Sequence, residues 1–390
     1  YKSVHVTAFV KKEAYTACKA PRNISNVMVK HNVELSRFSY AYKKLVLNEQ
    51  HWYMPCRSMF DIGQAVQDFV LSNDYPVVET DFSKFDGTIS AWLRNNVEIA
   101  AYRQVSDRMA DLAQLEITAS CSTTENEQYD CAGSRLSGSP VTTDGNTIIA
   151  AFVDYCAGRE TGLGPVLAYK NIGLHFGDDG ISAPYPCLER VATELGLNLK
   201  CIERHSYVGF LGRIYPDPKN DIGSFQDPVR SWSRITTLAG PETPESLGRL
   251  KAKILSYLRS DANTPWLGDW LRQWLKEHEG ITTVDCEQDR SFVSYGHEWP
   301  PLQSVELSRT IIQEMLGMTA AEMDTATSGH SFWHEPVLEK GAEFCDSLVG
   351  GTAVVIHPAD FKEPGFISSG SKRSIRRKKQ RLNRLSHKDV

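Results

Sequence analysis

The chain has 390 residues, of which 41% are hydrophobic and 10% aromatic. This is enough apolar material for a large core, so it excludes intrinsic disorder for most of the length. The net charge of −5, from 43 basic and 48 acidic residues, argues at first sight against a nucleic-acid-binding protein. No run of about 20 apolar residues predicts a membrane span. The nine scattered cysteines form no CxxC pair, which indicates reduced thiols rather than a disulfide framework or a zinc site.

The first predicted elements come from short apolar patterns. Residues 76–81, Pro-Val-Val-Glu-Thr-Asp, predict a strand that ends in an acid. Apolar residues at helical spacing predict a helix from Ile89 to about Val105. Residues 120–140 are rich in Ser, Thr, Gly and Asp and predict a loop, whereas 147–157 predict a buried helix.

A hairpin is the strongest local prediction of the next segment. Residues 166–176 predict a strand, 177–180 (Gly-Asp-Asp-Gly) a tight turn and 181–183 the returning strand. The later elements follow in order: a helix over 187–197, a strand pair over 207–215, helices over 244–275 and 302–323, and a Ser/Gly-rich and then basic segment after about 367.

Three carboxylates stand where predicted strands end: Asp81, Asp178 and Asp179. If the two strand ends lie side by side, these groups repel one another unless cations sit between them. Hard oxygen ligands select Mg²⁺ or Mn²⁺, and two such ions are the standard device for in-line phosphoryl transfer. A turn former or helix cap is the alternative interpretation, and for an isolated Gly-Asp-Asp it would be preferred.

Three motifs in order change that balance. Residues 81–88 carry Asp81 and Asp86 as D-x4-D, and Gly177-Asp178-Asp179 form G-D-D. Between them, S-G-x3-T-x3-N-T is matched by Ser137, Gly138, Thr142, Asn146 and Thr147. Together they closely resemble motifs A, B and C of the RNA-dependent RNA polymerases of positive-strand RNA viruses. The residues around the three motifs are most similar to the nodavirus replicase polymerase domain, with noda-like and tombusvirus-like relatives next.

The resemblance implies an α+β right-hand polymerase with an antiparallel palm sheet and a helix-rich thumb. It predicts partial fingers over 1–70, a palm over 71–220 with an inserted fingers segment near 105–136, a thumb and helical region over 221–366, and a basic tail over 367–390. Because a substantial fingers extension usually precedes the first basic strand pair, we expect the chain to be the C-terminal part of a longer replicase.

The resemblance also implies roles for the motif residues. Asp81 and Asp178 would ligate two Mg²⁺ or Mn²⁺ ions, with Asp179 completing the site, while the 3′-hydroxyl of RNA attacks an NTP. Asp86 and Asn146 would recognise the ribose hydroxyls, and a missing 2′-hydroxyl would cost roughly 1–3 kcal/mol. Ser137, Gly138 and Thr142 would line the nucleotide and template, where glycine permits close approach.

Basic residues are assigned on the same resemblance, each beside a plainer alternative. Lys11, Lys12, Lys19 and Arg22 resemble motif F, which covers the incoming triphosphate, although a solvated basic face would look similar. Lys200 resembles the motif D lysine that protonates pyrophosphate, but a surface lysine is at least as common. Residues 207–215 resemble motif E, the primer grip, with Arg213 as an RNA contact; a core hairpin is the alternative.

The tail revises the meaning of the net charge. Residues 372–390 contain nine basic residues and one acid, a charge of +8, and the remaining 34 basic and 47 acidic residues leave −13. We expect Arg376, Arg377, Lys378, Lys379 and Arg381 to bind RNA. A solvated tail, a localisation signal and an anionic-membrane contact are the alternatives.

Two other functions compete with RNA synthesis. A reverse transcriptase is disfavoured by Gly177, Asp86 and Asn146, because that class usually reads Tyr-x-Asp-Asp and places an aromatic side chain near the sugar. A non-catalytic RNA-binding scaffold is disfavoured because all three carboxylates are present. The implied partners are template and product RNA, NTPs, the upstream replicase and further copies of the chain. The implied location is the host cytoplasm, in replication complexes held at membranes through segments outside this chain.

Overall fold

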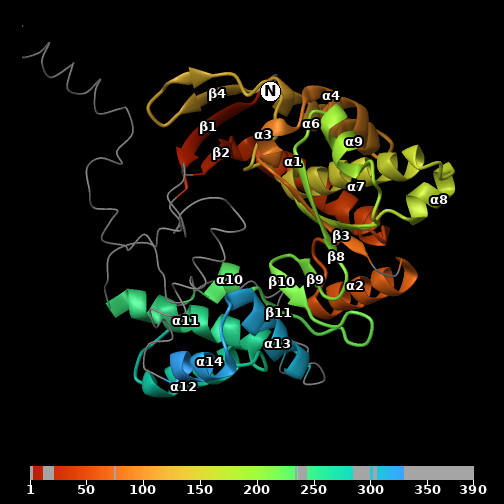
Figure 1. Ribbon diagram of the computed structural model, residues 1–390. Coiled ribbons are helices and arrows are strands. Elements are labelled where there is room, and N and C mark those ends of the chain that lie inside the picture. The colour runs from red at the N-terminus through yellow and green to blue at the C-terminus, as the bar shows by residue number, and fades with distance from the viewer. Residues whose placement is uncertain are drawn as a thin grey trace, which may run out of the picture.

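The computed structural model describes residues 3–11, 22–73, 76–232, 235, 244–283, 299–301 and 305–328. In Figure 1 a larger body holds α1 to α9 and two sheets, and a smaller body holds the helices α10 to α14. The short strands β9 to β11 lie between them. The division into fingers, palm and thumb at the stated residues stays a prediction.

The central sheet is antiparallel, with the strand order β6-β7-β3-β8. Alternate side chains point to opposite faces of its strands. Val78 and Phe82 pack on one face against helices α7 and α9, whereas Val77 and Ile181 pack on the other against α2. The bounds are β3 (Val77–Phe82), β6 (Leu174–Phe176), β7 (Asp179–Ser182), β8 (Leu199–Arg204), α2 (Met59–Asn73), α7 (Thr142–Glu160) and α9 (Leu188–Glu194). The predicted domain division at residue 70 falls inside α2.

A second sheet corrects the predicted loop over 120–140. Its order is β2-β1-β4-β5, from β1 (His5–Val10), β2 (Asn23–Val27), β4 (Ser120–Thr123) and β5 (Gln128–Tyr129). Strand β4 pairs in parallel with β1, and Cys121 is buried in the same apolar cluster as Val6. A local composition of Ser and Thr cannot reveal a strand whose partner lies more than 100 residues away.

Helices surround these sheets, and the predicted helix over 89–105 is present in three pieces. The middle piece is a π-helical turn, η2, which directs Arg94 and Glu98 into the interior. The bounds are α1 (Val29–Leu45), η1 (Leu47–Glu49), α3 (Phe85–Thr88), α4 (Ala91–Leu93), η2 (Arg94–Glu98), α5 (Ile99–Arg103) and α6 (Asp107–Ile117).

The predicted strand over 166–176 is wrong for its first half. Helix α8 (Pro165–Lys170) occupies it, with Gly164 at the N-cap and Pro165 in the first turn. Proline is favourable there because its fixed φ suits a helix start and its missing N–H would have no helical partner. Strand β6 keeps only the last three residues, ahead of the predicted hairpin turn.

The C-terminal region is helical, as predicted. A three-stranded sheet in the order β11-β10-β9 precedes it, and its helices share a core that includes Trp232, Trp270 and Ile312. The bounds are β9 (Val208–Phe210), β10 (Arg213–Tyr215), β11 (Phe225–Gln226), α10 (Pro228–Ser231), α11 (Pro244–Asp261), α12 (Leu267–Glu277), α13 (Val305–Leu316) and α14 (Ala320–Thr327). Within the described ranges, no helix combines the length and apolarity that crossing a membrane requires.

Candidate active site

The acidic residues meet at the centre of the antiparallel sheet. On β3, Asp81 stands opposite Asp179 of β7 and, on its other side, opposite Lys200 of β8. Asp178 lies in the two-residue turn between β6 and β7, where Gly177 has a φ of +64°. The Phe82 N–H donates to the Asp178 carbonyl oxygen at 3.3 Å. The expectation that the two strand ends lie side by side is confirmed.

The electrostatics of this acidic cluster leave it short of positive charge. Partial desolvation and the nearby Asp178 raise the pKa of Asp81, and Lys200 and Arg230 partly oppose this rise. Burial and Asp178 also raise the pKa of Asp179 to about 6. Carboxylates that raise one another's pKa gain most from a bound cation, because the cation removes their repulsion. Their oxygen atoms suit a hard divalent ion.

The three carboxylates are not drawn together into a closed ligand set. Over the ranges that the structure describes, no three or more His, Cys, Asp or Glu side chains cluster tightly enough to hold a metal ion by themselves. Asp81 and Asp178 are exposed and Asp179 is half-buried. The arrangement therefore supplies suitable donors without a closed coordination shell made by these side chains alone.

Helix α7 holds the acidic hairpin at both ends. The Gly177 N–H donates to the Thr147 hydroxyl at 2.9 Å, beside the turn. At the base, Asp154 accepts from the Gly173 N–H at 2.7 Å and from the Ser182 hydroxyl at 2.5 Å. These contacts are buried, so α7 determines where the turn with Asp178 lies.

The second motif pair also meets. After β3 the chain turns through Lys84, whose φ of +54° is rare for a residue other than glycine. This turn starts α3 and directs Asp86 toward α7, where the Asn146 amide donates to Asp86 Oδ1 at 2.8 Å. The rings of Phe82 and Phe85 stack with centroids 4.1 Å apart and support the turn. Two residues predicted to act together are therefore in direct contact.

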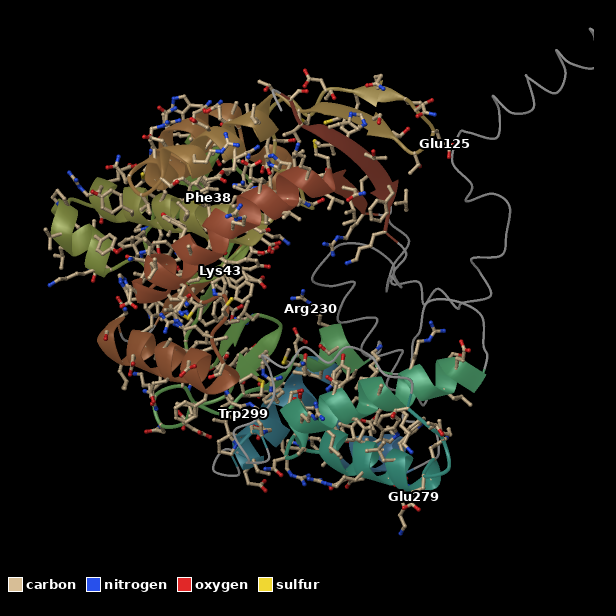
Figure 2. The ribbon with its side chains drawn as sticks, turned by 180° about the vertical axis from the view of Figure 1, so that it is seen from behind. Phe38, Lys43, Glu125, Arg230, Glu279 and Trp299 are labelled. Carbon is tan, nitrogen blue, oxygen red and sulfur yellow. The ribbon has the colours of Figure 1, made fainter. Side chains whose placement is uncertain are left out.

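A cavity of about 420 Å³ opens beside the acidic cluster. Asp81, Asp179 and Lys200 line it from the central sheet, and Arg230 adds positive charge. Arg204 also lines the cavity, but it is paired with Glu79 at 2.8 Å. Figure 2 shows Arg230 at α10, directed toward the space between the smaller body and the larger one. The site thus combines acids for a cation with bases for an anionic ligand.

Comparison with known proteins decides the family. Residues 55–199 match the family model for viral RNA-dependent RNA polymerase. The RNA-directed RNA polymerase of striped jack nervous necrosis virus is 38% identical over 336 residues, which is 82% of this chain and 34% of that protein. That of Pariacoto virus is 32% identical, over 83% of this chain and 34% of its own length. The chain belongs to the viral RNA-dependent RNA polymerase family.

The chain spans about a third of the length of these curated relatives. Among solved structures, the RNA-dependent RNA polymerase of a human picobirnavirus aligns with a TM-score of 0.52 at 13% identity, over 70% of this chain and 55% of that one. At this identity the likeness shows the fold, and it confirms the predicted α+β polymerase architecture.

In this chain, the residues that match motif B contact the N-terminal sheet. The Ser25 N–H donates to the Ser137 hydroxyl at 3.0 Å, and a Cβ on Gly138 would lie 2.3 Å from the Ser25 carbonyl oxygen. The Thr142 hydroxyl donates to the carbonyls of Leu136 and Ser139. The close approach that requires glycine is therefore to strand β2, and a nucleotide contact by these three residues stays a prediction.

The basic residues of motif F are only partly described. Strands β1 and β2 form the expected strand pair, which is antiparallel, and the Lys11 N–H donates to the Arg22 carbonyl oxygen at 2.8 Å where they end. Lys12 and Lys19 lie outside the described residues, as do Arg376, Arg377, Lys378, Lys379 and Arg381 of the tail. Their roles stay predictions.

Arg213, predicted as an RNA contact, is engaged inside the protein, and its predicted role stays a prediction. Its guanidinium is buried at the junction of β10 with the helical body and forms an ion pair with Asp261 at 3.2 Å. It also donates to the Ser224 hydroxyl at 2.9 Å and to the carbonyls of Ser224 and Ser260. These partners engage its donors inside the protein, so Arg213 joins motif E to α11.

Three functional candidates were not predicted from the sequence. Arg135 and Glu98 form a buried ion pair next to Asn146. Arg230 lines the cavity wall and partly opposes the rise in the pKa of Asp81 and of Asp179. A signal for Arg135 exists, since it precedes the Ser137-Gly138 pair by two residues, but the charge alone does not reveal its partner.

Proposed function

We propose that this chain synthesises RNA on an RNA template, transferring nucleotides from NTPs to the 3′-hydroxyl of the growing strand. The register that places Asp81 opposite Asp179, with Asp178 in the adjoining turn, carries the proposal. Asp81 and Asp179 line a cavity together with Lys200 and Arg230, and Asp178 lies in the turn next to it. That combination suits a metal-assisted reaction of a polyanionic nucleotide.

In this proposal the three carboxylates hold two divalent ions, Mg²⁺ or Mn²⁺. The bound ions would supply charge stabilisation for the attacking and leaving oxygens. Lys200, opposite Asp81, would donate a proton toward the leaving pyrophosphate, and Asp86 with Asn146 would bind the ribose hydroxyls. Arg230, in the cavity wall, would orient the phosphates, so that most of the catalysis is positioning and electrostatics.

Primer extension on an RNA template tests the function. The wild-type chain is expected to incorporate ribonucleotides with Mg²⁺ or Mn²⁺, and D178A and D81N are expected to lose incorporation while keeping the fold. Lys200 is exposed, so K200A should slow incorporation without lowering the melting temperature. Preference for deoxyribonucleotides would indicate a reverse transcriptase instead. RNA binding without synthesis, unchanged in D81N, would indicate a scaffold.

We further propose a context for this activity, supported by the resemblance to nodavirus polymerases. The chain would act in the host cytoplasm within membrane-associated replication complexes, bound to template and product RNA. It would work with the remainder of a longer replicase and with further copies of itself. Pull-down of the chain from cells that express a full-length replicase, followed by light scattering of the purified chain, tests these partners.

A further inference from the structure

The Asn146 amide lies between two charged side chains. Its Nδ2 donates to Asp86 Oδ1 at 2.8 Å, and its Oδ1 accepts from Arg135 Nε at 2.9 Å. The next link is an ion pair in which Arg135 donates from Nη1 and Nη2 to the two oxygens of Glu98, both at 2.7 Å. One chain of hydrogen bonds therefore runs from the buried Glu98 to the Asp86 carboxylate.

This chain of contacts sets the direction of the amide. An asparagine side chain has an accepting end and a donating end, whereas a guanidinium only donates and a carboxylate only accepts. Arg135 can therefore face only Oδ1, which turns Nδ2 toward Asp86. The bond occupies Asp86 Oδ1, and a carboxylate has a second oxygen, Oδ2, that can accept from a hydroxyl.

The ion pair itself is built into the fold. Both side chains are fully buried, and Glu98 also bonds to Tyr102 and pairs with Arg94. Burial favours the neutral form of Glu98, but Arg135 and Arg94 outweigh it and lower the Glu98 pKa. A Cβ on Gly145 would lie 2.5 Å from Arg135 Nη2. Glycine beside Asn146 thus makes room for the pair.

We propose that Arg135 is a positioning residue for sugar selection. By fixing the Asn146 amide it holds Asp86 in the orientation that accepts a hydrogen bond from the 2′-hydroxyl of an incoming nucleotide. The substrate class it favours is ribonucleoside triphosphates over their deoxy counterparts. This inference rests on the proposed RNA synthesis, and it assigns the selectivity to a residue buried behind the Asp86–Asn146 pair.

The test compares single-nucleotide incorporation of ATP and dATP by two matched double variants. R135M/E98Q removes the donor to Asn146 and neutralises its partner together, so no unpaired charge stays buried. R94M/E116Q makes the same two replacements in a neighbouring buried ion pair, 3.1 Å apart. Arg94 also pairs with Glu98 at 3.5 Å, so this control removes one partner of Glu98 but keeps the hydrogen bonds of Arg135 to Glu98 and Asn146. Melting temperatures of both variants report the structural cost.

We expect R135M/E98Q to lose about tenfold of the ATP-over-dATP ratio of kcat/KM, since roughly one hydrogen bond to the sugar is misaligned. R94M/E116Q should keep that ratio within about twofold at a similar melting temperature. R135K keeps the charge but loses the planar fork that reaches Glu98 and Asn146 together. It should therefore lose part of the ratio, and it serves as the test if R135M/E98Q does not fold. An unchanged ratio in R135M/E98Q or R135K overturns the inference alone. A wild-type chain that incorporates neither nucleotide overturns the proposed function and this inference with it.

Discussion

The Thr147 hydroxyl accepts a hydrogen bond from the backbone N–H of Gly177 at 2.9 Å, across 30 residues of sequence. Two helical turns further along α7, Asp154 binds the base of the same hairpin. The residue before Thr147, Asn146, contacts Asp86. One helix thus positions both the acidic turn and Asp86.

Replacing Thr147 with valine should loosen the acidic turn. Valine matches the shape of threonine but cannot accept the buried Gly177 N–H, and an unsatisfied buried donor costs about 1–3 kcal/mol. We expect the free energy of unfolding of T147V to fall by this amount. T147V should also incorporate nucleotides more slowly, because Asp178 loses its fixed position. T147S keeps the acceptor and is the control. Equal rates in T147V and the wild type would contradict the expectation.

Two glycines of the hairpin should respond differently to alanine. At Gly177, which has a φ of +64°, a Cβ meets nothing within 4 Å, so G177A should cost only the left-handed backbone strain of about 1–2 kcal/mol. At Gly173 a Cβ would lie 1.8 Å from the Ile181 carbonyl oxygen. Alanine there must displace a strand, which we expect to cost about 3 kcal/mol. Denaturant unfolding of G173A and G177A measures both, and equal costs would refute the steric account.

The raised pKa of Asp179 predicts a pH dependence. Its folded-state pKa of about 6 lies above its ordinary 3.8, so between these values the folded chain binds more protons than the unfolded chain. The contribution of Asp179 to stability therefore falls as the pH rises from about 4 to 6. Without divalent ions, the melting temperature of D179N relative to the wild type should rise over this window. A constant difference between the two would contradict the shift.

Divalent ions should reverse this trend. A cation binds the ionised carboxylate and competes with the proton. Millimolar Mg²⁺ or Mn²⁺ should raise the wild-type melting temperature more at pH 7 than at pH 5. D179N should respond less to the ion and depend less on pH. A response to Mg²⁺ that is equal at both pH values would mean that Asp179 does not bind the ion.

Arg213 is expected to matter for stability rather than for RNA affinity. Removing one partner of a buried ion pair leaves an uncompensated charge and costs about 3–5 kcal/mol. R213M should therefore have a lower free energy of unfolding than the wild type, and R213M/D261N should recover part of that lost stability. Among folded molecules, the dependence of RNA binding on salt should not change, because no phosphate contact is lost. A reduced salt slope in R213M/D261N would restore the predicted RNA contact.

The sequence by itself determined the local pieces of this site. Periodicity and turn residues, which act over a few neighbours, predict the acid at the end of β3, the Gly-Asp-Asp turn, the strand pair over 207–215 and the C-terminal helices. The motif order also determined the family, and with it the expected contact between Asp86 and Asn146. The apolar run over 166–176 fits either a strand or a helix, and its pattern alone predicted a strand. Pro165 favours the helix start that the structure shows.

Only the tertiary structure decided which residues share a partner. Arg135 and Arg213 look alike in sequence, yet one meets Glu98, 37 residues away, and the other Asp261, 48 residues away. Strand β4 exists because β1 lies beside it. The residue type alone does not determine whether a charged or polar side chain will be buried with a partner or exposed to a ligand. That choice follows from the packing of distant segments, where desolvation makes each unpaired group costly.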